Sequence, residues 1–150
     1  MEKLENEVLR EENVKTEREY FRIDLISYED RSTGKPIIGK LQDYSWNLLC
    51  AVEHENDHRL WVDEVVKLAH VVCPLRVVIG YLPIDEKENV AEYLERLAAH
   101  LCEIDAFRYS SGFGEFMLIL GDCRIRSKKD RCVYSAYKWN DGAFIPQAEK

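Results

Sequence analysis

Hydrophobic and polar positions change their spacing several times along the chain, and each change predicts a different element. The opening residues are charged apart from a narrow apolar stripe, on which Leu4 and Val8 lie one helical turn apart. This spacing predicts a charged helix over residues 1–16. Residues 19–29 alternate between apolar and polar side chains instead, and alternation with period two predicts a strand.

Two amphipathic helices among apolar runs complete the pattern. Residues 47–52 are almost wholly apolar and predict a buried strand, residues 60–70 have apolar side chains at helical spacing, and residues 75–81 predict another buried strand. The remaining expectations are a turn at 30–35, a short extended piece at 36–40, a helix over 85–103 capped by Asp85, strands over 113–120 and 132–139, and an irregular tail at 140–150. This order predicts an α/β domain with a mixed sheet covered on both faces by helices, ending in a helix and a β-hairpin.

Composition limits the class of protein. A chain of 150 residues with 46% hydrophobic and 33% charged residues fits one globular domain over 1–150. It has no apolar run of membrane-spanning length and does not open with a signal peptide, so a cytoplasmic protein that does not contact membranes is expected. The net charge of −7 lowers the expected non-specific affinity for nucleic acid but leaves room for a local basic patch.

Cysteine usage agrees with this expectation. The chain has five cysteines and no CxxC pair, and most of them stand inside apolar stretches. They are predicted to be reduced, buried thiols: Cys50, Cys73, Cys102, Cys123 and Cys132. Cys50 and Cys73 have no obvious base partner, so the sequence does not support thiol catalysis.

The end of the apolar run at 47–52 allows two different chemistries. On a strand, Glu53 and Glu55 point to the same face. On a helix, His54-Glu55-x-x-His58 matches the zinc-peptidase signature, in which both histidines share one face. The preceding strand-like run, the poor helix former Asn56 and the lack of a well-placed third ligand favour the strand.

The strand interpretation brings in a third carboxylate. If residues 19–29 pair antiparallel with the strand that ends at Glu53, Asp24 lies beside Glu53. Three clustered carboxylates repel one another unless a cation compensates them, and oxygen ligands suit Mg²⁺ or Mn²⁺. Asp24, Glu53 and Glu55 are therefore candidate metal ligands, and a metal held there can activate water for phosphodiester hydrolysis.

The order of Asp24 on one strand, Glu53-His54-Glu55 at the end of another, then a helix and a buried strand resembles the PD-(D/E)XK nuclease superfamily. Its restriction-endonuclease-like core (α-β-β-β-α-β) would extend from the first helix to about Tyr81. The resemblance implies that Asp24 and Glu53 bind metal. Glu55 stands where lysine is usual, and Lys67 is a candidate for a lysine moved onto the following helix. Many members also have a glutamate on the first helix, for which this chain offers Glu5, Glu7 and Glu12.

The expected function is metal-dependent cleavage of nucleic acid, with DNA as the first candidate. Glu55 would ligate the metal or orient the water, and Lys67 would stabilise developing charge. The only basic cluster would contact phosphates, or be a solvated turn: Arg124, Arg126, Lys128, Lys129 and Arg131.

Other interpretations stay open at this point. Asp24 could simply pair with a cation, the two glutamates could be a solvated strand end, and Lys67 could pair with Asp63 one turn away. The alternative function is a non-catalytic binding module on the same fold, and a zinc peptidase comes third. The oligomeric state is open, with a homodimer as one option.

Overall fold

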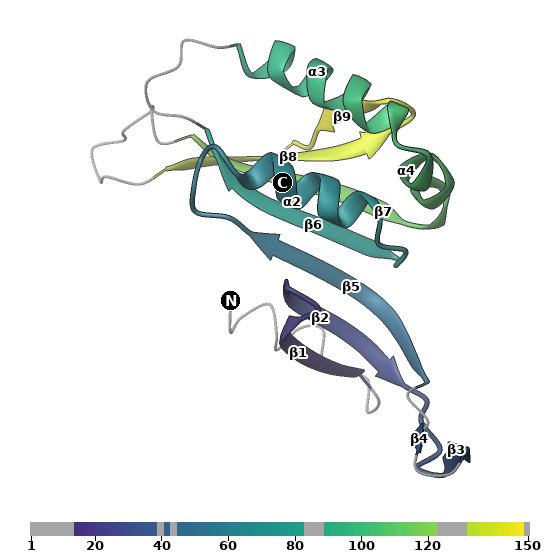
Figure 1. Cartoon of the computed structure of the whole chain (residues 1–150). Helices are drawn as coiled ribbons and strands as arrows, with labels where there is room; N and C mark the ends of the chain where they lie inside the picture. Colours follow the sequence, from purple (N-terminus) through teal and green to yellow (C-terminus); the bar gives the residue numbers. More distant parts are fainter. Residues whose placement is uncertain (1–13, 39–40, 43–44, 83–88, 123–131, 149–150) are drawn as a thin grey trace.

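The computed structural model describes residues 14–38, 41–42, 45–82, 89–122 and 132–148 of the chain. Seven strands form one mixed sheet in the order β1-β2-β5-β6-β7-β8-β9 (Figure 1). These strands are β1 (Val14–Tyr20), β2 (Ile23–Asp30), β5 (Trp46–His54), β6 (Leu75–Tyr81), β7 (Glu115–Asp122), β8 (Val133–Asn140) and β9 (Ala143–Pro146). A separate two-stranded ribbon, β3 (Pro36–Ile38) and β4 (Leu41–Gln42), lies between β2 and β5 in the chain.

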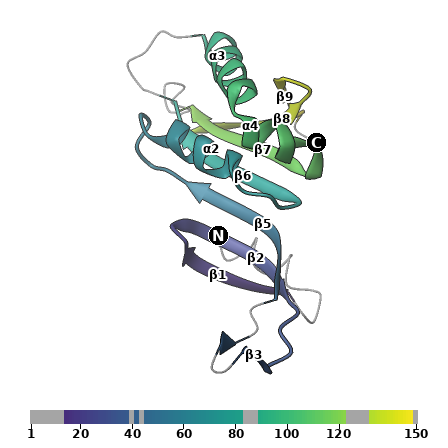
Figure 2. The same cartoon turned by 45° about the vertical axis from the view of Figure 1, so that its right-hand side comes forward.

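The central strands β5, β6 and β7 run parallel, and the remaining neighbours in the large sheet pair antiparallel. Helix α2 (Trp61–Ala69) connects β5 to β6, and α3 (Val90–Glu103) and α4 (Asp105–Ser110) connect β6 to β7. Both crossovers advance in the same direction along the sheet, and right-handed crossovers of this kind place their helices on one face. The three helices also contact one another, and α2 lies over β6 in both views (Figures 1 and 2).

The α/β class and the mixed sheet are confirmed, but the prediction of helices on both faces is not met in the described part of the chain. The two faces of β6 differ in burial: Val78 is fully buried under α2, whereas Val77 and Ile79 on the other face are only half-buried. The core therefore lies between the sheet and a single helical layer.

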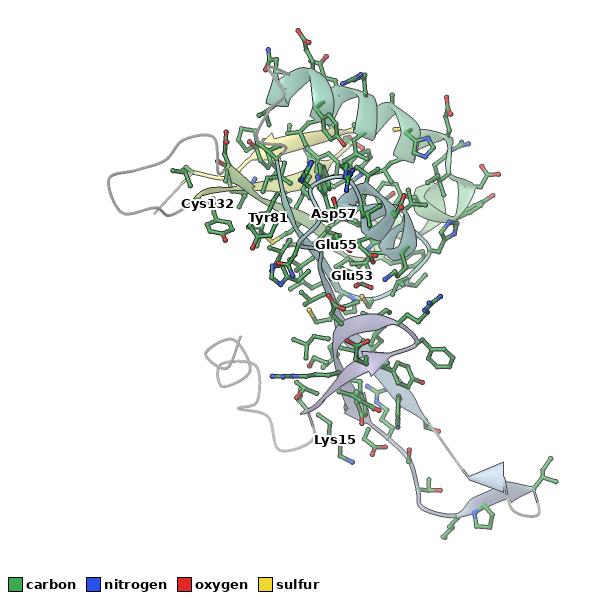
Figure 3. The ribbon with its side chains drawn as sticks, turned by 60° about the vertical axis from the view of Figure 1, so that its left-hand side comes forward. Lys15, Glu53, Glu55, Asp57, Tyr81 and Cys132 are labelled. Atoms are coloured by element: carbon green, nitrogen blue, oxygen red, sulfur yellow. The ribbon has the colours of Figure 1, made fainter. Side chains whose placement is uncertain are left out.

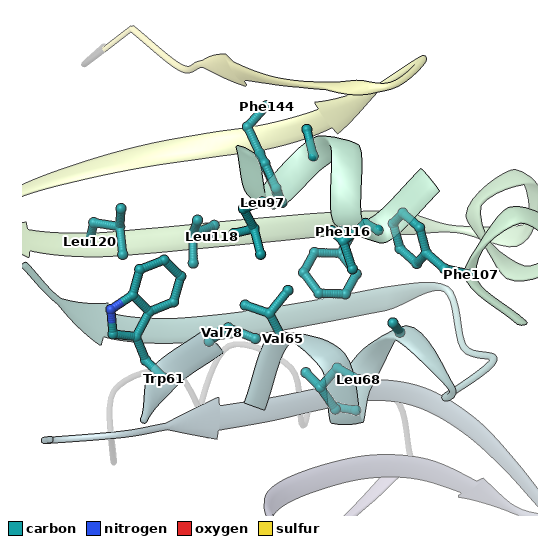
Figure 4. Packing of buried hydrophobic residues seen from close by; sticks show 14 of the residues in the cluster. Trp61, Val65, Leu68, Val78, Leu97, Phe107, Phe116, Leu118, Leu120 and Phe144 are labelled. Carbon is teal, nitrogen blue, oxygen red and sulfur yellow. The ribbon is translucent and has the colours of Figure 1, made fainter. Parts of the chain in front are cut away.

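Close approach of α2 to β6 depends on one glycine. Trp61, Val65 and Leu68 on the apolar face of α2 are fully buried against the sheet (Figure 4). A Cβ at Gly80 would lie 2.6 Å from Cγ of Trp61, so only glycine leaves room for the indole at this position.

The N-terminal part of the sheet differs from the sequence-based prediction. The first strand begins at Val14, where a helix had been expected to continue to residue 16, and residues 1–13 lie outside the described part. The strand predicted over 19–29 is divided by a turn at Phe21-Arg22, and β1 and β2 pair on either side of it. Pairing with β2 therefore outweighs the helical propensity of the charged segment.

Differences towards the C-terminus concern boundaries and one missed strand. Asn89, whose side chain accepts a hydrogen bond from the amide of Ala91 at 3.0 Å, caps α3. The predicted cap, Asp85, lies outside the described residues. Helix α4 was not predicted. The tail expected to be irregular forms β9, which pairs with β8 across a two-residue turn at Asp141-Gly142 with φ 47° and 91°.

One cysteine also departs from the prediction. Cys132 is disulfide-bonded, whereas Cys50, Cys73 and Cys102 are free. The expectation that all five are reduced is therefore wrong for Cys132. Among the described residues, no helix has the length and apolar character needed to cross a membrane.

Candidate functional site

Antiparallel pairing of β2 with β5 brings the predicted acidic residues to one place. Leu25 pairs with Val52 and Ile26 with Ala51, so the next position along each strand places Asp24 beside Glu53. Alternation puts Asp24 and Glu53 on the same face as Ile26 and Ala51, which are buried. This is the face covered by α2, so the carboxylates point towards the helix.

Glu53 is buried, and its carboxylate is held by Lys67 of α2. The side chain of Glu53 is 2% exposed, and its Oε1 accepts a hydrogen bond from Nζ of Lys67 at 2.8 Å. Lys67 also forms an ion pair with Glu64 and donates to the backbone carbonyl of Arg22 at 2.9 Å. One ammonium group therefore joins α2, β5 and the β1–β2 turn.

Burial has the largest effect on the ionisation of Glu53. Loss of hydration raises the pKa of Glu53 to about 7, the hydrogen bond from Lys67 opposes that rise, and the charges of Glu64 and Asp24 add to it. Burial acts to lower the pKa of Lys67, but its hydrogen bonds with Glu53 and Glu64 give a net rise. A carboxyl group that changes charge near neutral pH, beside a lysine that stays charged, is typical of functional sites.

The other two predicted ligands bond to backbone amides. Oδ2 of Asp24 accepts a hydrogen bond from the amide of His54 at 2.7 Å, and Oε1 of Glu55 accepts one from the amide of Asp57 at 2.7 Å. A carboxylate has two oxygens and about four lone-pair sites, so each group keeps acceptor capacity for a further partner.

These groups line one pocket of about 350 Å³ at the end of β5. It is lined by Arg22, Asp24, Glu53, His54, Glu55, Glu64 and Lys67. Four carboxylates therefore face two cations. In Figure 3, Glu53 and Glu55 lie between the β1–β2 hairpin and the part of the sheet that the helices cover.

Carboxylate oxygens are the donors that a hard divalent cation prefers, so the chemistry of this pocket fits Mg²⁺ or Mn²⁺. The distances between the potential ligands fit a metal less well than their chemistry does. In the described part of the chain, no three His, Cys, Asp or Glu side chains are close enough together to hold a metal ion. The ammonium of Lys67 stands between Glu53 and Glu64 and supplies the positive charge there.

Sequence reasoning missed Glu64 and assigned Lys67 a different possible partner. The structure pairs Lys67 with Glu64, three residues earlier on α2, and with Glu53, instead of with Asp63. The signal for Glu64 was its i, i+3 spacing from Lys67, which puts both side chains on the same side of the helix.

The segment of the zinc-peptidase signature is not helical. His54 is the last residue of β5, and His58 lies in a turn after two irregular residues, so the two imidazoles are not arranged on one helical face. Nε2 of His54 instead lies 3.0 Å from the hydroxyl of Tyr81, which in turn lies 3.3 Å from the hydroxyl of Tyr134. This bond with Tyr134, together with burial, raises the pKa of Tyr81 to about 12.

Two groups of predicted site residues lie outside the described part of the chain. They are the basic cluster at 124–131 and the candidate glutamates Glu5, Glu7 and Glu12. The described site therefore consists of the pocket between β2, β5 and α2. Comparisons of this chain with protein-family models, with curated proteins and with solved structures found no match.

Proposed function

We propose that this chain hydrolyses phosphodiester bonds in nucleic acid with the help of a divalent cation, Mg²⁺ or Mn²⁺. One observation carries the proposal: Asp24 and Glu53 from two antiparallel strands and Lys67 from the following helix line the same pocket. A buried carboxyl group whose pKa is raised to about 7, next to a lysine at the end of a central strand, is an arrangement found often at functional sites.

The strand order adds support for a restriction-endonuclease-like core. Within the large sheet, strands β1, β2 and β5 precede α2 and β6 along the chain, and the separate β3–β4 ribbon lies between β2 and β5. The sequence had suggested 19–29, 36–40 and 47–52 as the three strands before the helix, so the agreement with the PD-(D/E)XK order concerns the strands that carry Asp24 and Glu53, then α2 and β6. Asp24 lies on β2 and Glu53 near the end of β5, in the order along the chain on which the proposed resemblance rests. The first helix of such a core was expected over residues 1–16; residues 14–16 belong to β1, and residues 1–13 lie outside the described part.

Each residue of the pocket has a role in this proposal. Asp24 and Glu53 would hold the cation, with Glu55 as a further ligand or as the group that orients the attacking water. A cation held there would supply the Lewis acidity that activates water and the positive charge that offsets the phosphate. Lys67 now bonds to Glu53, Glu64 and the carbonyl of Arg22. If the cation takes over Glu53, the released donor of Lys67 would bond to the leaving oxygen, on which negative charge grows as the P–O bond breaks.

A non-catalytic binding module is the second candidate, and a specific contact favours it. Lys67 already forms ion pairs with both Glu53 and Glu64, and no three-ligand group is assembled among the residues that the structure describes. In that case the cluster stabilises the contact between α2 and β5, and the pocket needs no metal.

Thermal unfolding with added metal separates the two functions without a known substrate. A ligand that binds only the folded state at about 100 times its dissociation constant stabilises it by about 2.7 kcal/mol. The nuclease proposal expects Mn²⁺ to raise the melting temperature of the wild type, Asp24→Asn to abolish the shift, and the exposed control Asp105→Asn to keep it. The wild type and Asp105→Asn should then cleave DNA or RNA oligonucleotides in Mg²⁺, and Asp24→Asn should not.

Two results would contradict the proposal. If EDTA and Mn²⁺ give the same melting temperature, the binding module is the better description. If Zn²⁺ stabilises the wild type and His58→Ala removes that effect, the zinc interpretation of the His54–His58 segment returns in spite of its non-helical backbone.

A further inference from the structure

We propose that the tip of the β1–β2 hairpin, Phe21-Arg22, grips a nucleic-acid strand beside the pocket. Arg22 would bind a phosphate next to the cleaved bond, and Phe21 would stack on an unpaired base. The substrate class would then be single-stranded nucleic acid, or a duplex with an unpaired base next to the cleaved bond. This inference rests on the proposed function, whose active site shares Arg22 with the tip.

The backbone of the tip is held in a conformation that its residues disfavour. Tyr20 pairs with Ile23, which leaves a two-residue turn, and Phe21 and Arg22 have φ 48° and 63°. Turns with positive φ at both positions strongly prefer Asn-Gly, because a side chain with a Cβ is strained there. Nothing in turn stability explains Phe-Arg, and strain of this kind concentrates at functional sites.

Two cationic side chains line the pocket, Arg22 and Lys67, and the charged group of Arg22 is the one available to a ligand. Its backbone carbonyl accepts a hydrogen bond from Lys67 at 2.9 Å, which ties the tip to the site. Its side chain lines the pocket, and its guanidinium makes no hydrogen bond or ion pair with any residue in the described ranges. Lys67, in contrast, is occupied by Glu53 and Glu64. A guanidinium with no partner among the described residues suits the two-pronged recognition of a phosphate.

Phe21 offers an aromatic face to solvent. It is 79% exposed, so its burial contributes little to folding. Its ring is braced edge-on by Tyr20, with centroids 4.6 Å apart, and Tyr20 in turn contacts Trp46. An exposed ring with firm support is the arrangement on which unstacked bases bind.

The neighbourhood favours nucleic acid over a protein partner. An exposed aromatic and an arginine also occur at protein interfaces. Here, however, the arginine lines the same pocket as the proposed phosphodiester site, and the two tip residues are adjacent in the chain. One ligand with a phosphate and a base a few ångströms apart satisfies both side chains, and nucleic acid repeats that unit along its length.

A double variant tests the tip because it should change binding and stability in opposite directions. Phe21→Asn with Arg22→Gly gives the turn the residues it prefers, so its melting temperature should equal or exceed that of the wild type. Its affinity for a fluorescein-labelled single-stranded oligonucleotide, measured by anisotropy in Ca²⁺, should fall about tenfold or more. The slope of log affinity against log salt concentration should also become shallower by about one unit, since one phosphate contact is gone.

Phe113→Ala with Arg108→Ala is the matched control. It removes an exposed aromatic, 71% accessible, and one arginine near the opposite end of the parallel strands, where Glu115 pairs with Leu75. The control should bind the oligonucleotide like the wild type. Replacing the single strand by a fully paired duplex should weaken wild-type binding and reduce the effect of the tip variant.

Several results would overturn this inference. They are no oligonucleotide binding by the wild type, unchanged affinity in the tip variant, equal loss in tip variant and control, or equal loss on single strand and duplex. Mn²⁺ stabilisation tests the proposed function separately. If Mn²⁺ does not stabilise the protein but the tip variant alone loses oligonucleotide binding, the nuclease proposal fails and nucleic-acid binding by Phe21 and Arg22 is still supported.

Discussion

Glu53 on β5 and Lys67 on α2 form an ion pair between the sheet and the helical layer, with Oε1 and Nζ 2.8 Å apart. The two partners differ in exposure: the side chain of Glu53 is 2% exposed and that of Lys67 34%. The buried partner is hydrated only poorly if the pair is broken, because β5 and α2 cover most of its side chain. The stability of this part of the fold therefore depends on the lysine even if the site has no catalytic role.

Lys67→Met should destabilise the protein at alkaline pH. The change leaves Glu53 buried without its cation, and breaking a fully buried pair costs about 3–5 kcal/mol. Because Lys67 is partly exposed, we expect about 2–3 kcal/mol in the free energy of unfolding at pH 8. Urea denaturation with EDTA present measures it.

The double variant Lys67→Met/Glu53→Gln is the control for that experiment. It removes the buried charge together with its partner, so it should recover most of the stability lost in Lys67→Met. If the double variant is no more stable than Lys67→Met, the loss comes from the packing of the lysine side chain instead of from the unpaired carboxylate.

Glu53 should make the metal-free protein less stable as pH rises from about 4.5 to 7. Its pKa is about 7 in the folded state, raised chiefly by burial, against 4.5 in an exposed glutamate. In that interval the folded state binds more protons than the unfolded state, so raising the pH favours unfolding. Below pH 4.5 both states are protonated, and above pH 7 the full penalty applies.

Glu53→Gln should remove this part of the pH dependence. The amide oxygen can still accept the bond from Lys67, and no charge has to be buried, so we expect a gain of about 1–3 kcal/mol at pH 8 and little change near pH 4.5. Chemical denaturation across this range provides the measurement, with the exposed Glu115→Gln as a matched control. A parallel displacement of the whole curve, instead of a change in slope, would contradict the assignment.

Much of the central fold could be predicted from hydrophobic spacing. Residues 75–81 were predicted as a strand and form β6 with the same bounds, and residues 60–70 were predicted as a helix and form α2. The β1–β2 hairpin could not be predicted, because Phe21-Arg22 has none of the usual turn residues. The β8–β9 hairpin did carry a signal, Asp141-Gly142, which the expectation of a frayed tail overlooked.

The candidate site was predictable only in part. Alternation placed Glu53 and Glu55 at the end of one strand, and antiparallel pairing placed Asp24 near them. The partners of Lys67 depended on a tertiary contact: Glu53 is 14 residues away in the chain, and only the packing of α2 on β5 joins the two. Local spacing suggested Asp63, which is why the observed ion pairs could not be read from the helix alone.

Gly80→Ala should destabilise the protein because the new methyl group would overlap the indole of Trp61. The Cβ would lie 2.6 Å from Cγ and 2.7 Å from Cβ of Trp61, which is fully buried and cannot swing away. Overpacking of a core costs about 1–3 kcal/mol, and we expect the upper part of that range. Gly112→Ala is the matched control, since its Cβ would meet no atom within 4 Å. Equal melting temperatures for the two variants would mean that α2 can move away from the sheet without loss.

Arg76 gives the last prediction, because it is a fully buried cation on β6 without a carboxylate partner in the described part of the chain. Its guanidinium donates to Oγ of Ser110 at 2.8 Å and to the carbonyl of Ser110 at 3.2 Å. It also lies over the rings of Phe107 and Phe116, 5.6 and 5.2 Å from their centroids. Burial lowers the pKa of Arg76, with the Cys73 thiol opposing that effect. The guanidinium of Arg76 therefore holds α4 against the sheet through its planar shape as much as through its charge.

We expect Arg76→Lys to be less stable than Arg76→Met. Lysine keeps the buried charge but hydrates more strongly, cannot stack on both rings and has no fork for the two Ser110 acceptors. Methionine removes the charge, fills similar volume and makes favourable contacts with aromatic rings, although the carbonyl of Ser110 loses a donor. Urea denaturation should therefore give a loss of about 3 kcal/mol for lysine and a smaller one for methionine. The opposite order would show that positive charge, and not the guanidinium shape, is what this position requires.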